Sequence, residues 1–178
     1  MTYETTRLFF RPLEEKDAES LFKNVYSDEN VNRYLRFDTH KNVEETKKVI
    51  KEFLENNQEI YVLIEKETKE IIGTIEIADK SLINQTCAIG YLIGSKWWSL
   101  GYGTEALKQT ISFLFQNFDY QLIETVVRND NKGSAKICEK SQMKLDGILR
   151  NRRIDKIDGH RDDIRVYSIT KQEWRNLS

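Results

Sequence analysis

The sequence is poor in the residues that bind metals or cross-link a chain. It contains two cysteines, Cys87 and Cys138, and two histidines, His40 and His160, with no Cys-x-x-Cys pair. A structural zinc site needs more Cys and His ligands than these, so we expect no bound metal. Two isolated thiols are typical of a reducing compartment, and we expect a cytoplasmic protein.

Neither charge nor hydrophobicity is concentrated along the chain. The 28 Lys and Arg residues nearly balance the 29 Asp and Glu residues, which argues against a general electrostatic attraction to nucleic acid or an anionic membrane. No apolar run approaches the roughly 20 residues of a transmembrane helix. The 178 residues are enough for one hydrophobic core. We therefore expect a single domain over residues 1–178, a monomer or homodimer, without nucleic-acid or membrane partners.

Hydrophobic spacing predicts alternating strands and helices. The expected strands cover residues 6–12, 59–65, 70–79, 86–94, 121–127, 145–154 and 162–170, and the expected helices cover 18–25, 42–57, 107–118 and 129–143. In the second helix, Asn42 and Glu45 have the spacing of a capping box. Its expected inner face consists of Val43, Thr46, Ile50, Phe53 and Leu54. This order predicts an α/β fold with a mixed sheet of about seven strands and helices on both faces.

Glycine is concentrated directly before the third helix. Of the eight glycines, four fall between Gly90 and Gly103, and a glycine-rich turn that enters a helix can present backbone N–H groups to phosphate. The P-loop string is absent. Gly101-x-Gly103-x-x-Ala106 matches the dinucleotide pattern, with Glu124 where a ribose-binding acid is expected, but it comes late in the chain rather than opening a βαβ unit. Two other interpretations are a strand exit and a pyrophosphate loop of the form [Q/R/W]-x-x-G-x-[G/A].

Four strings in order carry a more specific likeness. They are "RLFFRPLEEKDA", "IGYLIGSKWWSLGYGTEAL", "NKGSAKICEKSQMKLDGILR" and "DIRVYSITKQEW", and they span Arg7 to Trp174. Together they resemble the GNAT superfamily of acetyl-CoA-dependent N-acetyltransferases, closest to the branch of ribosomal-protein N-terminal acetyltransferases (RimJ/RimL-like). The resemblance implies a GNAT-like acyl-CoA N-acyltransferase fold, with a mostly antiparallel sheet, a splayed central parallel pair and acetyl-CoA as co-substrate.

The resemblance also implies where the cofactor binds. Backbone groups of Leu92 and Ile93 would pair with the pantetheine arm, as a ligand strand pairs with a sheet edge, and the Leu92 N–H would polarise the thioester carbonyl. The expected pyrophosphate loop consists of Trp98, Ser99, Leu100, Gly101, Tyr102, Gly103 and Thr104.

Three residues of the fourth helix complete the implied site. Asn131 would hydrogen-bond the pantetheine arm, or act only as a helix cap. Ser134 would protonate the departing thiolate, directly or through water. Cys138, one turn further on, is an alternative proton donor or a buried structural thiol.

The general base is where the chain departs from its relatives. Ala88 and Arg153 occupy positions at which members of the family carry glutamate, so we consider Glu76 as the base, acting through water, or as a solvated strand residue. Otherwise the base has moved, the enzyme accepts a neutral amine, or activity is reduced. The basic residues Arg150, Arg152, Arg153 and Lys156 either steer an acidic substrate or the CoA 3′-phosphate, or form a solvated face.

The expected function is transfer of the acetyl group from acetyl-CoA to an amine by direct attack in a ternary complex. The expected acceptor is a protein or peptide N-terminal amine, such as that of a ribosomal protein, and a polyamine or other small amine is the alternative. A catalytically idle acyl-CoA-binding module and a nicotinamide-dependent oxidoreductase are the alternatives from other classes. We expect acceptor selectivity to lie in the first two helices, the loop from Leu35 to His40 and the last hairpin.

Overall fold

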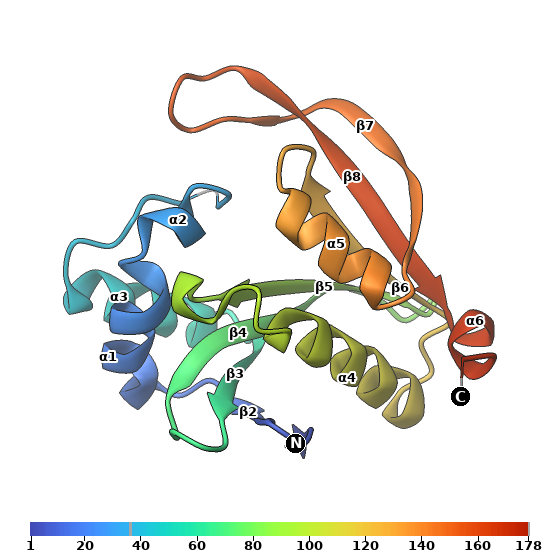
Figure 1. Cartoon of the computed structure of the whole chain (residues 1–178), viewed down its shortest axis with the longest axis horizontal. Helices are drawn as coiled ribbons and strands as arrows, with labels where there is room; N and C mark the ends of the chain where they lie inside the picture. The colour runs from blue at the N-terminus through green and yellow to red at the C-terminus, as the bar shows by residue number, and fades with distance from the viewer. Residues whose placement is uncertain (36, 178) are drawn as a thin grey trace. The chain divides into compact units, whose positions relative to one another are not determined.

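A computed structural model describes residues 1–35 and 37–177 of the chain. Its contacts divide it into two compact units, one of residues Met1–Ile77 and Tyr91–Ala106, the other of Ala78–Gly90 and Leu107–Ser178 (Figure 1). The strands β4 (Ile71–Ser81) and β5 (Thr86–Ile93) each run through both units, so no linker separates them. The single domain expected from the length stays a prediction.

The first unit is built on an antiparallel sheet. Its strands are β1 (Tyr3–Glu4), β2 (Leu8–Pro12), β3 (Glu59–Glu65) and the first part of β4, in the order β1-β2-β3-β4. Strand β2 ends at the proline, which has no N–H for a sheet ladder. The helical segments are η1 (Glu15–Asp17), α1 (Ala18–Leu21), the π-helical η2 (Phe22–Tyr26), α2 (Glu29–Asn32), α3 (Val43–Glu55) and η3 (Ser95–Trp97).

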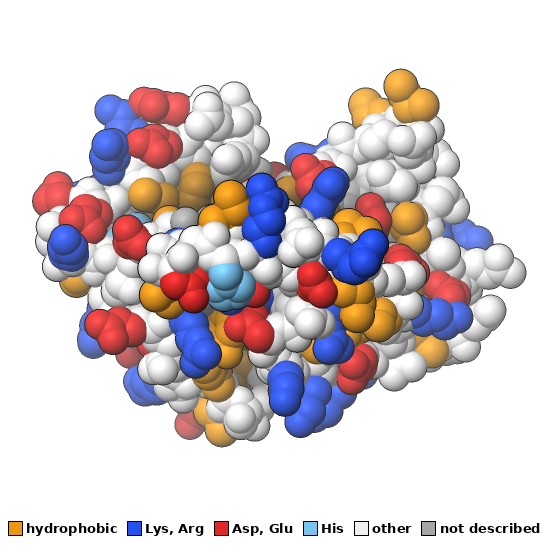
Figure 2. Space-filling model, turned by 90° about the horizontal axis from the view of Figure 1, so that it is seen from above, with side chains coloured by type: hydrophobic (Ala, Val, Ile, Leu, Met, Phe, Trp, Pro, Cys, Tyr) orange, Lys and Arg blue, Asp and Glu red, His pale blue; other side chains and the backbone are white. Residues whose placement is uncertain are grey.

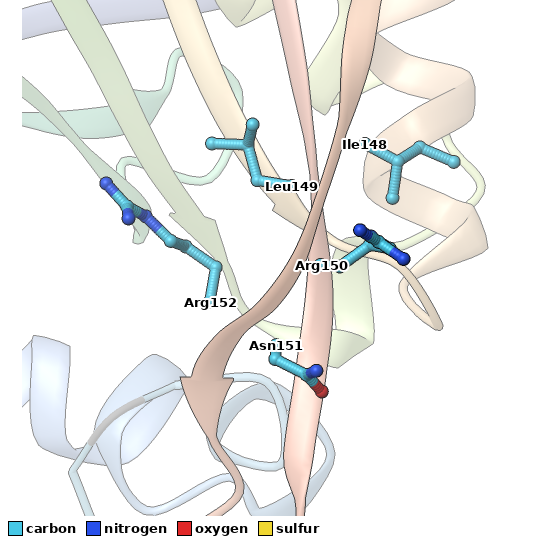
Figure 3. Close-up of a pocket in the computed structure, with 5 residues that line it drawn as sticks. All are labelled: Ile148, Leu149, Arg150, Asn151 and Arg152. Atoms are coloured by element: carbon cyan, nitrogen blue, oxygen red, sulfur yellow. The ribbon is translucent and has the colours of Figure 1, made fainter.

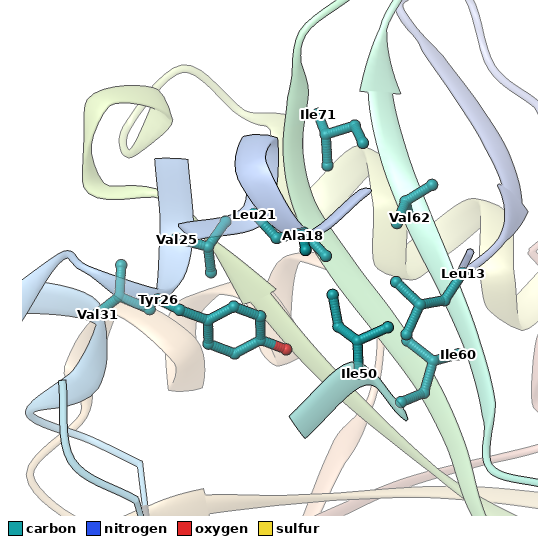
Figure 4. Close-up of a cluster of buried hydrophobic side chains, with 10 residues drawn as sticks. All are labelled: Leu13, Ala18, Leu21, Val25, Tyr26, Val31, Ile50, Ile60, Val62 and Ile71. Carbon is teal, nitrogen blue, oxygen red and sulfur yellow. The ribbon is translucent and has the colours of Figure 1, made fainter. Parts of the chain in front are cut away.

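Apolar side chains from these helices and strands form one buried cluster (Figure 4). Its members are Leu13, Ala18, Leu21, Val25, Tyr26, Val31, Ile50, Ile60, Val62 and Ile71. The expected helix at 18–25 is confirmed as α1 continued by the π turn η2. Of the periodic positions Ala18, Leu21, Phe22 and Val25, three are buried in the cluster and Phe22 is only half-buried. A helical segment this short depends on such packing for its stability.

Helix α3 follows the expected pattern with two differences. The Asn42 side chain caps it by accepting the Glu45 N–H at 3.1 Å, but the Glu45 carboxylate accepts the N–H of Lys41, at 2.8 Å, rather than that of Asn42. Thr46 and Ile50 are fully buried, as predicted. Leu54, expected on the inner face, is 36% exposed, because it lies in the last turn beyond the cluster.

The second unit contains the parallel pair. Strand β5 pairs parallel with β6 (Leu122–Arg128), β6 antiparallel with β8 (Arg161–Thr170), and β8 antiparallel with β7 (Lys144–Ile154), in the order β5-β6-β8-β7. Its helices are α5 (Lys132–Lys140), α6 (Lys171–Arg175) and most of α4 (Tyr102–Asn117). The seven expected strands are present as β2 to β8, and β1 is an additional strand of two residues.

The parallel pairing is short, which confirms the expected splay. The register covers Thr86–Ala88 against Leu122–Glu124, although β5 continues to Ile93. Where the ladder stops, the buried Thr125 hydroxyl donates to the Ile89 carbonyl at 2.7 Å. A side-chain hydrogen bond therefore replaces a backbone one at the point where the two strands begin to part.

Candidate active site

The segment after β5 is held tightly against the first helices. The Gly94 N–H donates to the Ile72 carbonyl at 2.9 Å, and the Asn24 side chain of η2 donates to the Ile71 carbonyl at 2.9 Å. A Cβ added to Gly94 would lie 2.0 Å from the Asn24 carbonyl oxygen, which no real contact tolerates. Gly94 is therefore required because the backbone of the π turn approaches the end of the strand.

The loop that follows begins with a side-chain hydrogen bond back to β5. The Trp98 indole N–H donates to the Ile93 carbonyl at 2.7 Å, while the ring itself is 42% exposed. The Ile93 carbonyl oxygen, one of the backbone groups expected to pair with the pantetheine arm, therefore already accepts one hydrogen bond within the protein, and its pairing with a ligand stays a prediction. Leu92 is half-buried, with its carbonyl oxygen close over Gly73.

Two residues of the loop adopt left-handed backbone conformations. Ser99 has φ 63° and Gly101 has φ 87°, and between them Leu100 is 56% exposed. A non-glycine residue at positive φ costs about 1–2 kcal/mol, and such strain is concentrated at ligand-binding sites. The loop therefore has a defined, strained shape with an apolar side chain facing solvent.

The loop leads directly into the N-terminus of α4. The Glu105 N–H donates to the Gly101 carbonyl at 3.1 Å, so the N–H groups of Tyr102, Gly103 and Thr104 belong to the first helical turn, which has no intrahelical acceptors. These N–H groups and the helix dipole favour an anion. The structure thus brings the predicted pyrophosphate residues together as one turn and helix start.

Side chains distant in sequence contact this loop, and sequence reasoning did not single them out. Arg7 donates to the Leu100 carbonyl at 3.0 Å and forms an ion pair with Glu105 of α4. The phenol of Tyr102 is buried and hydrogen-bonds the Glu65 carboxylate of β3. The only sequence signal was that Arg7 and Glu105 both lie in the strings that carry the family likeness.

The three predicted residues of α5 lie at its start and on its buried face. The Asn131 side chain accepts the Ser134 N–H at 3.0 Å, so the cap role is confirmed, and it does not exclude a second contact through the amide nitrogen. Ser134 is half-buried in the first turn. Cys138 is completely buried, which favours a structural thiol over a proton donor.

Glu76 of β4 is half-buried and pairs with Ile60 of β3. Thr74, two residues earlier on the same face, hydrogen-bonds the buried Tyr26 phenol. Burial chiefly, and the charge of Glu76 in addition, raise the pKa of Tyr26 above its ordinary value. The Glu76 carboxylate therefore lies near the buried phenol of Tyr26.

A second carboxylate, Glu124, lies beside Ala88, one of the two positions at which the family resemblance led us to expect glutamate. Ala88 of β5 is in register with Glu124 of β6, which is half-buried. Paired residues of adjacent strands project to the same face of the sheet. The sequence had suggested Glu124 only as a ribose-binding acid, because strand register is a tertiary property.

The loop before α3 presents an aromatic group. His40 stacks on Tyr26 with ring centroids 4.9 Å apart, Phe37 lies 5.7 Å from both rings, and His40 Nδ1 hydrogen-bonds the Thr46 hydroxyl at 2.8 Å. Burial lowers the pKa of His40, so its imidazole is neutral at pH 7. Arg36, which belongs to the loop expected to select the acceptor, lies outside the described residues.

The basic residues expected on the last hairpin do not all project to the same side. A shallow pocket there is lined by Ile148, Leu149, Arg150, Asn151 and Arg152 (Figure 3). Figure 3 shows Arg150 pointing to the side of Ile148 and Arg152 to the side of Leu149. The pairing of β7 with β8 shifts between Leu149 and Arg153, with Asn151 at φ 53°. This bulge breaks the alternation that would have placed Arg150 and Arg152 together.

The turn end of the same hairpin is held by the buried side chain of Arg128. Arg128 of β6 pairs with Asp155 at 2.7 Å, Asp162 at 2.7 Å and Asp130 at 3.0 Å. The Ile157 N–H and then Arg128 lower the pKa of Asp155 to about 2. Asp155 is also grouped with Asp158 and His160, whose ligand atoms lie within 4.8 Å of one another. Both Asp155 oxygens accept hydrogen bonds, one from Arg128 and one from the Ile157 N–H, and these bonds stabilise the turn.

Charges of both signs are interspersed over the face shown in Figure 2, and neither sign dominates an extended area. Among residues 1–35 and 37–177, no helix combines the length and apolarity needed to cross a bilayer.

Comparison with known proteins identifies the family. Residues 7–144 match the family model described as the acetyltransferase (GNAT) domain. The chain is 30% identical to an uncharacterised N-acetyltransferase of Bacillus subtilis, YoaA, over 94% of this chain and 96% of that protein. It is 29% identical to an uncharacterised N-acetyltransferase of Bacillus licheniformis, p20, over 97% and 98%.

Solved structures share the fold. A GNAT-family acetyltransferase from Bacillus anthracis matches with a TM-score of 0.86 at 22% identity, over 97% of this chain and 100% of that one. A ribosomal-protein-S5-alanine acetyltransferase from Vibrio fischeri matches with a TM-score of 0.80 at 20% identity, over 98% of each chain. RimL, a ribosomal L7/L12 acetyltransferase in complex with coenzyme A, matches with a TM-score of 0.84 at 17% identity, over 97% of this chain and 99% of that one. The chain belongs to the acetyltransferase (GNAT) family and is an N-acetyltransferase.

Proposed function

We propose that this protein transfers the acetyl group of acetyl-CoA to the N-terminal amine of a protein or peptide. The observation that carries the cofactor assignment is the turn of Ser99 and Gly101, which enters the N-terminus of α4 with its first-turn N–H groups available to an anion. A coenzyme A complex of a structural neighbour supports the same assignment.

The chemistry follows from a ternary complex of thioester and amine. The neutral amine nitrogen forms a bond to the thioester carbonyl carbon, and the C–S bond breaks. The nitrogen gives up a proton as the amide forms, and the departing thiolate receives a proton. Holding both reactants in one site supplies much of the rate. The Leu92 N–H stabilises the oxyanion, a donor whose loss typically costs about 3 kcal/mol of transition-state stabilisation. Ser134, in the first turn of α5 and half-buried, delivers the proton to sulfur.

The incoming ammonium must lose a proton before it attacks. We assign this step to a strand carboxylate, either Glu76 or Glu124, both of which are half-buried. The Gln variant of the true base should lower kcat by about a hundredfold to ten-thousandfold and remove the acidic limb of the pH profile. Glu67→Gln, in the exposed β3–β4 turn, is the matched control. Equal, small losses in both test variants would contradict a carboxylate base.

The choice of acceptor rests on structural neighbours described as ribosomal-protein acetyltransferases. The test is release of CoA thiol from acetyl-CoA with a panel of peptides that differ in their first residues, the same peptides with blocked N-termini, and polyamines. Acetylation of free but not blocked peptides, confirmed by mass, supports the proposal. Turnover only with polyamines would replace the acceptor class. CoA binding without any turnover would indicate a binding module, and stabilisation by NAD but not by CoA would refute the cofactor assignment.

A further inference from the structure

We infer that Arg7 is a positioning residue for the cofactor loop and that it fixes the peptide group between Leu100 and Gly101. The inference rests on the proposed binding of acetyl-CoA by this loop. Arg7 precedes β2 and is far in sequence from the loop, yet its Nη1 donates to the Leu100 carbonyl at 3.0 Å.

Peptide geometry converts this contact into an orientation. In a planar trans peptide the C=O of one residue and the N–H of the next point in opposite directions. When Arg7 holds the Leu100 carbonyl, the Gly101 N–H must therefore point away from Arg7. Gly101 at φ 87° lets the chain continue from this orientation into α4. The same contact thus sets the direction of an N–H group in the predicted pyrophosphate loop.

Arg7 is itself held by several contacts to α4. Its Nε donates to Glu105 Oε2 at 2.6 Å, its Nη2 lies 2.5 Å from the same oxygen, and its backbone N–H donates to Glu105 Oε1 at 3.1 Å. The Thr5 hydroxyl also donates to Glu105 Oε1, at 2.5 Å. Burial tends to raise the pKa of Glu105, but the hydrogen bonds from Thr5 and Arg7 outweigh it and lower that pKa. The carboxylate is therefore ionised at neutral pH.

The Tyr102 ring packs against one face of the Arg7 guanidinium. The Arg7 guanidinium carbon lies 4.2 Å from the centroid of the Tyr102 ring, and the Tyr102 phenol hydrogen-bonds the buried Glu65 carboxylate. The Thr68 hydroxyl donates to the same carboxylate at 2.5 Å. The guanidinium is thus fixed by a carboxylate at its edge and a ring at its face, and its Nη1 donates to the loop.

The Arg7 charge is already neutralised by Glu105, which separates positioning from direct phosphate binding. If Arg7 contacted phosphate, its removal would reduce the dependence of CoA affinity on salt, because one charge–charge interaction that salt screens would be lost. If Arg7 only positions the loop, the salt dependence stays as in the wild type while the affinity falls. A lysine can reach either the carbonyl or the carboxylate but lacks the fork that holds both.

The test compares Arg7→Ala and Arg7→Lys with wild type and with Arg175→Ala, an exposed arginine of α6. Calorimetry should show CoA affinity reduced about tenfold for Arg7→Ala, the loss expected for a charge-assisted hydrogen bond, with an unchanged salt slope. Arg7→Lys should fall in between, and Arg175→Ala should match wild type. Glu105→Gln, which keeps the size of the anchor, should weaken CoA in the same direction if Arg7→Ala proves unstable.

A donor without the pyrophosphate distinguishes positioning from general damage to the fold. Arg7→Ala should raise KM for acetyl-CoA but leave kcat/KM for acetyl-pantetheine within about twofold, since that donor does not use the loop. Equal losses with both donors, or no loss with either, would overturn the inference. Calorimetry with CoA needs no acceptor, so the inference is tested even if turnover fails and the proposed reaction is wrong. A wild-type protein that does not bind CoA would overturn both.

Discussion

Gly101→Ala is the most direct test of the cofactor loop, because the structure offers a matched glycine elsewhere. Gly101 has φ 87° and Gly159, in the β7–β8 turn, has φ 75°. A Cβ at Gly101 would meet only Arg7 Nη2, at an ordinary contact distance of 3.4 Å, and a Cβ at Gly159 would meet nothing within 4 Å. Both substitutions therefore impose backbone strain with little steric overlap.

The strain sets the expected magnitudes. A left-handed conformation costs an L-residue about 1–2 kcal/mol, and replacing glycine recovers about 0.4–1 kcal/mol by restricting the unfolded chain. Each variant should lose about 0.5–1 kcal/mol of unfolding free energy, which lowers Tm by roughly 1–4 °C for a chain of this size. If the backbone at position 101 leaves the left-handed region in the Gly101→Ala variant, CoA binding must restore the left-handed conformation. The affinity should then fall by about 5- to 30-fold.

Thermal unfolding and CoA titration calorimetry on both variants measure these two effects separately. The expected result is a similar small loss of stability in each and a loss of CoA affinity in Gly101→Ala alone. A Gly101→Ala protein that binds CoA within twofold of wild type would refute the argument that this backbone conformation serves the cofactor. Equal losses of affinity in both variants would show that the effect is not local.

Three further predictions concern the fold that supports the site. Thr125→Val should lower the unfolding free energy by about 1–3 kcal/mol in urea titrations, because it leaves the Ile89 carbonyl without its 2.7 Å donor; a loss under about 0.5 kcal/mol would contradict this. Asp155→Asn should reduce the loss of stability at acid pH. The Asp155 carboxyl has a folded pKa of about 2 and an unfolded pKa of about 3.9, so it contributes stability above pH 4 that is lost as the pH falls towards 2. Identical acid unfolding curves for variant and wild type would rule this out. Ile50→Ala removes a fully buried side chain and should cost about 2–5 kcal/mol by chemical denaturation, whereas a cost near zero would show that the cluster collapses around the gap.

The order of elements could be predicted from the sequence because it depends on local periodicity. The seven longer strands and the four main helices follow from apolar spacing, and Asn42 and Asn131 were identified as helix-start residues. The segments that were missed are short. Strand β1 and helices α2 and α6 have two to five residues, too few for a periodic signal, and tertiary packing maintains them.

The residues around the candidate site were predictable only in part. The loop from Trp98 to Thr104 could be predicted because its two glycines, Gly101 and Gly103, are separated by a single residue. The divergence of Arg150 from Arg152 was not, since a bulge depends on the partner strand β8. The hydrogen bond from Trp98 to Ile93 was also missed, because it requires the exact turn that follows β5.

The sequence by itself determined the family, the element order and the glycine-rich turn that we propose binds the cofactor, because these depend on residues close together in the chain. The tertiary structure decided which distant side chains act on that loop. Arg7 lies 93 residues before Leu100, the carbonyl it holds, and Glu124 lies opposite Ala88 only through the register of β5 and β6. Such contacts depend on strand order and pairing, which no local pattern of residues encodes.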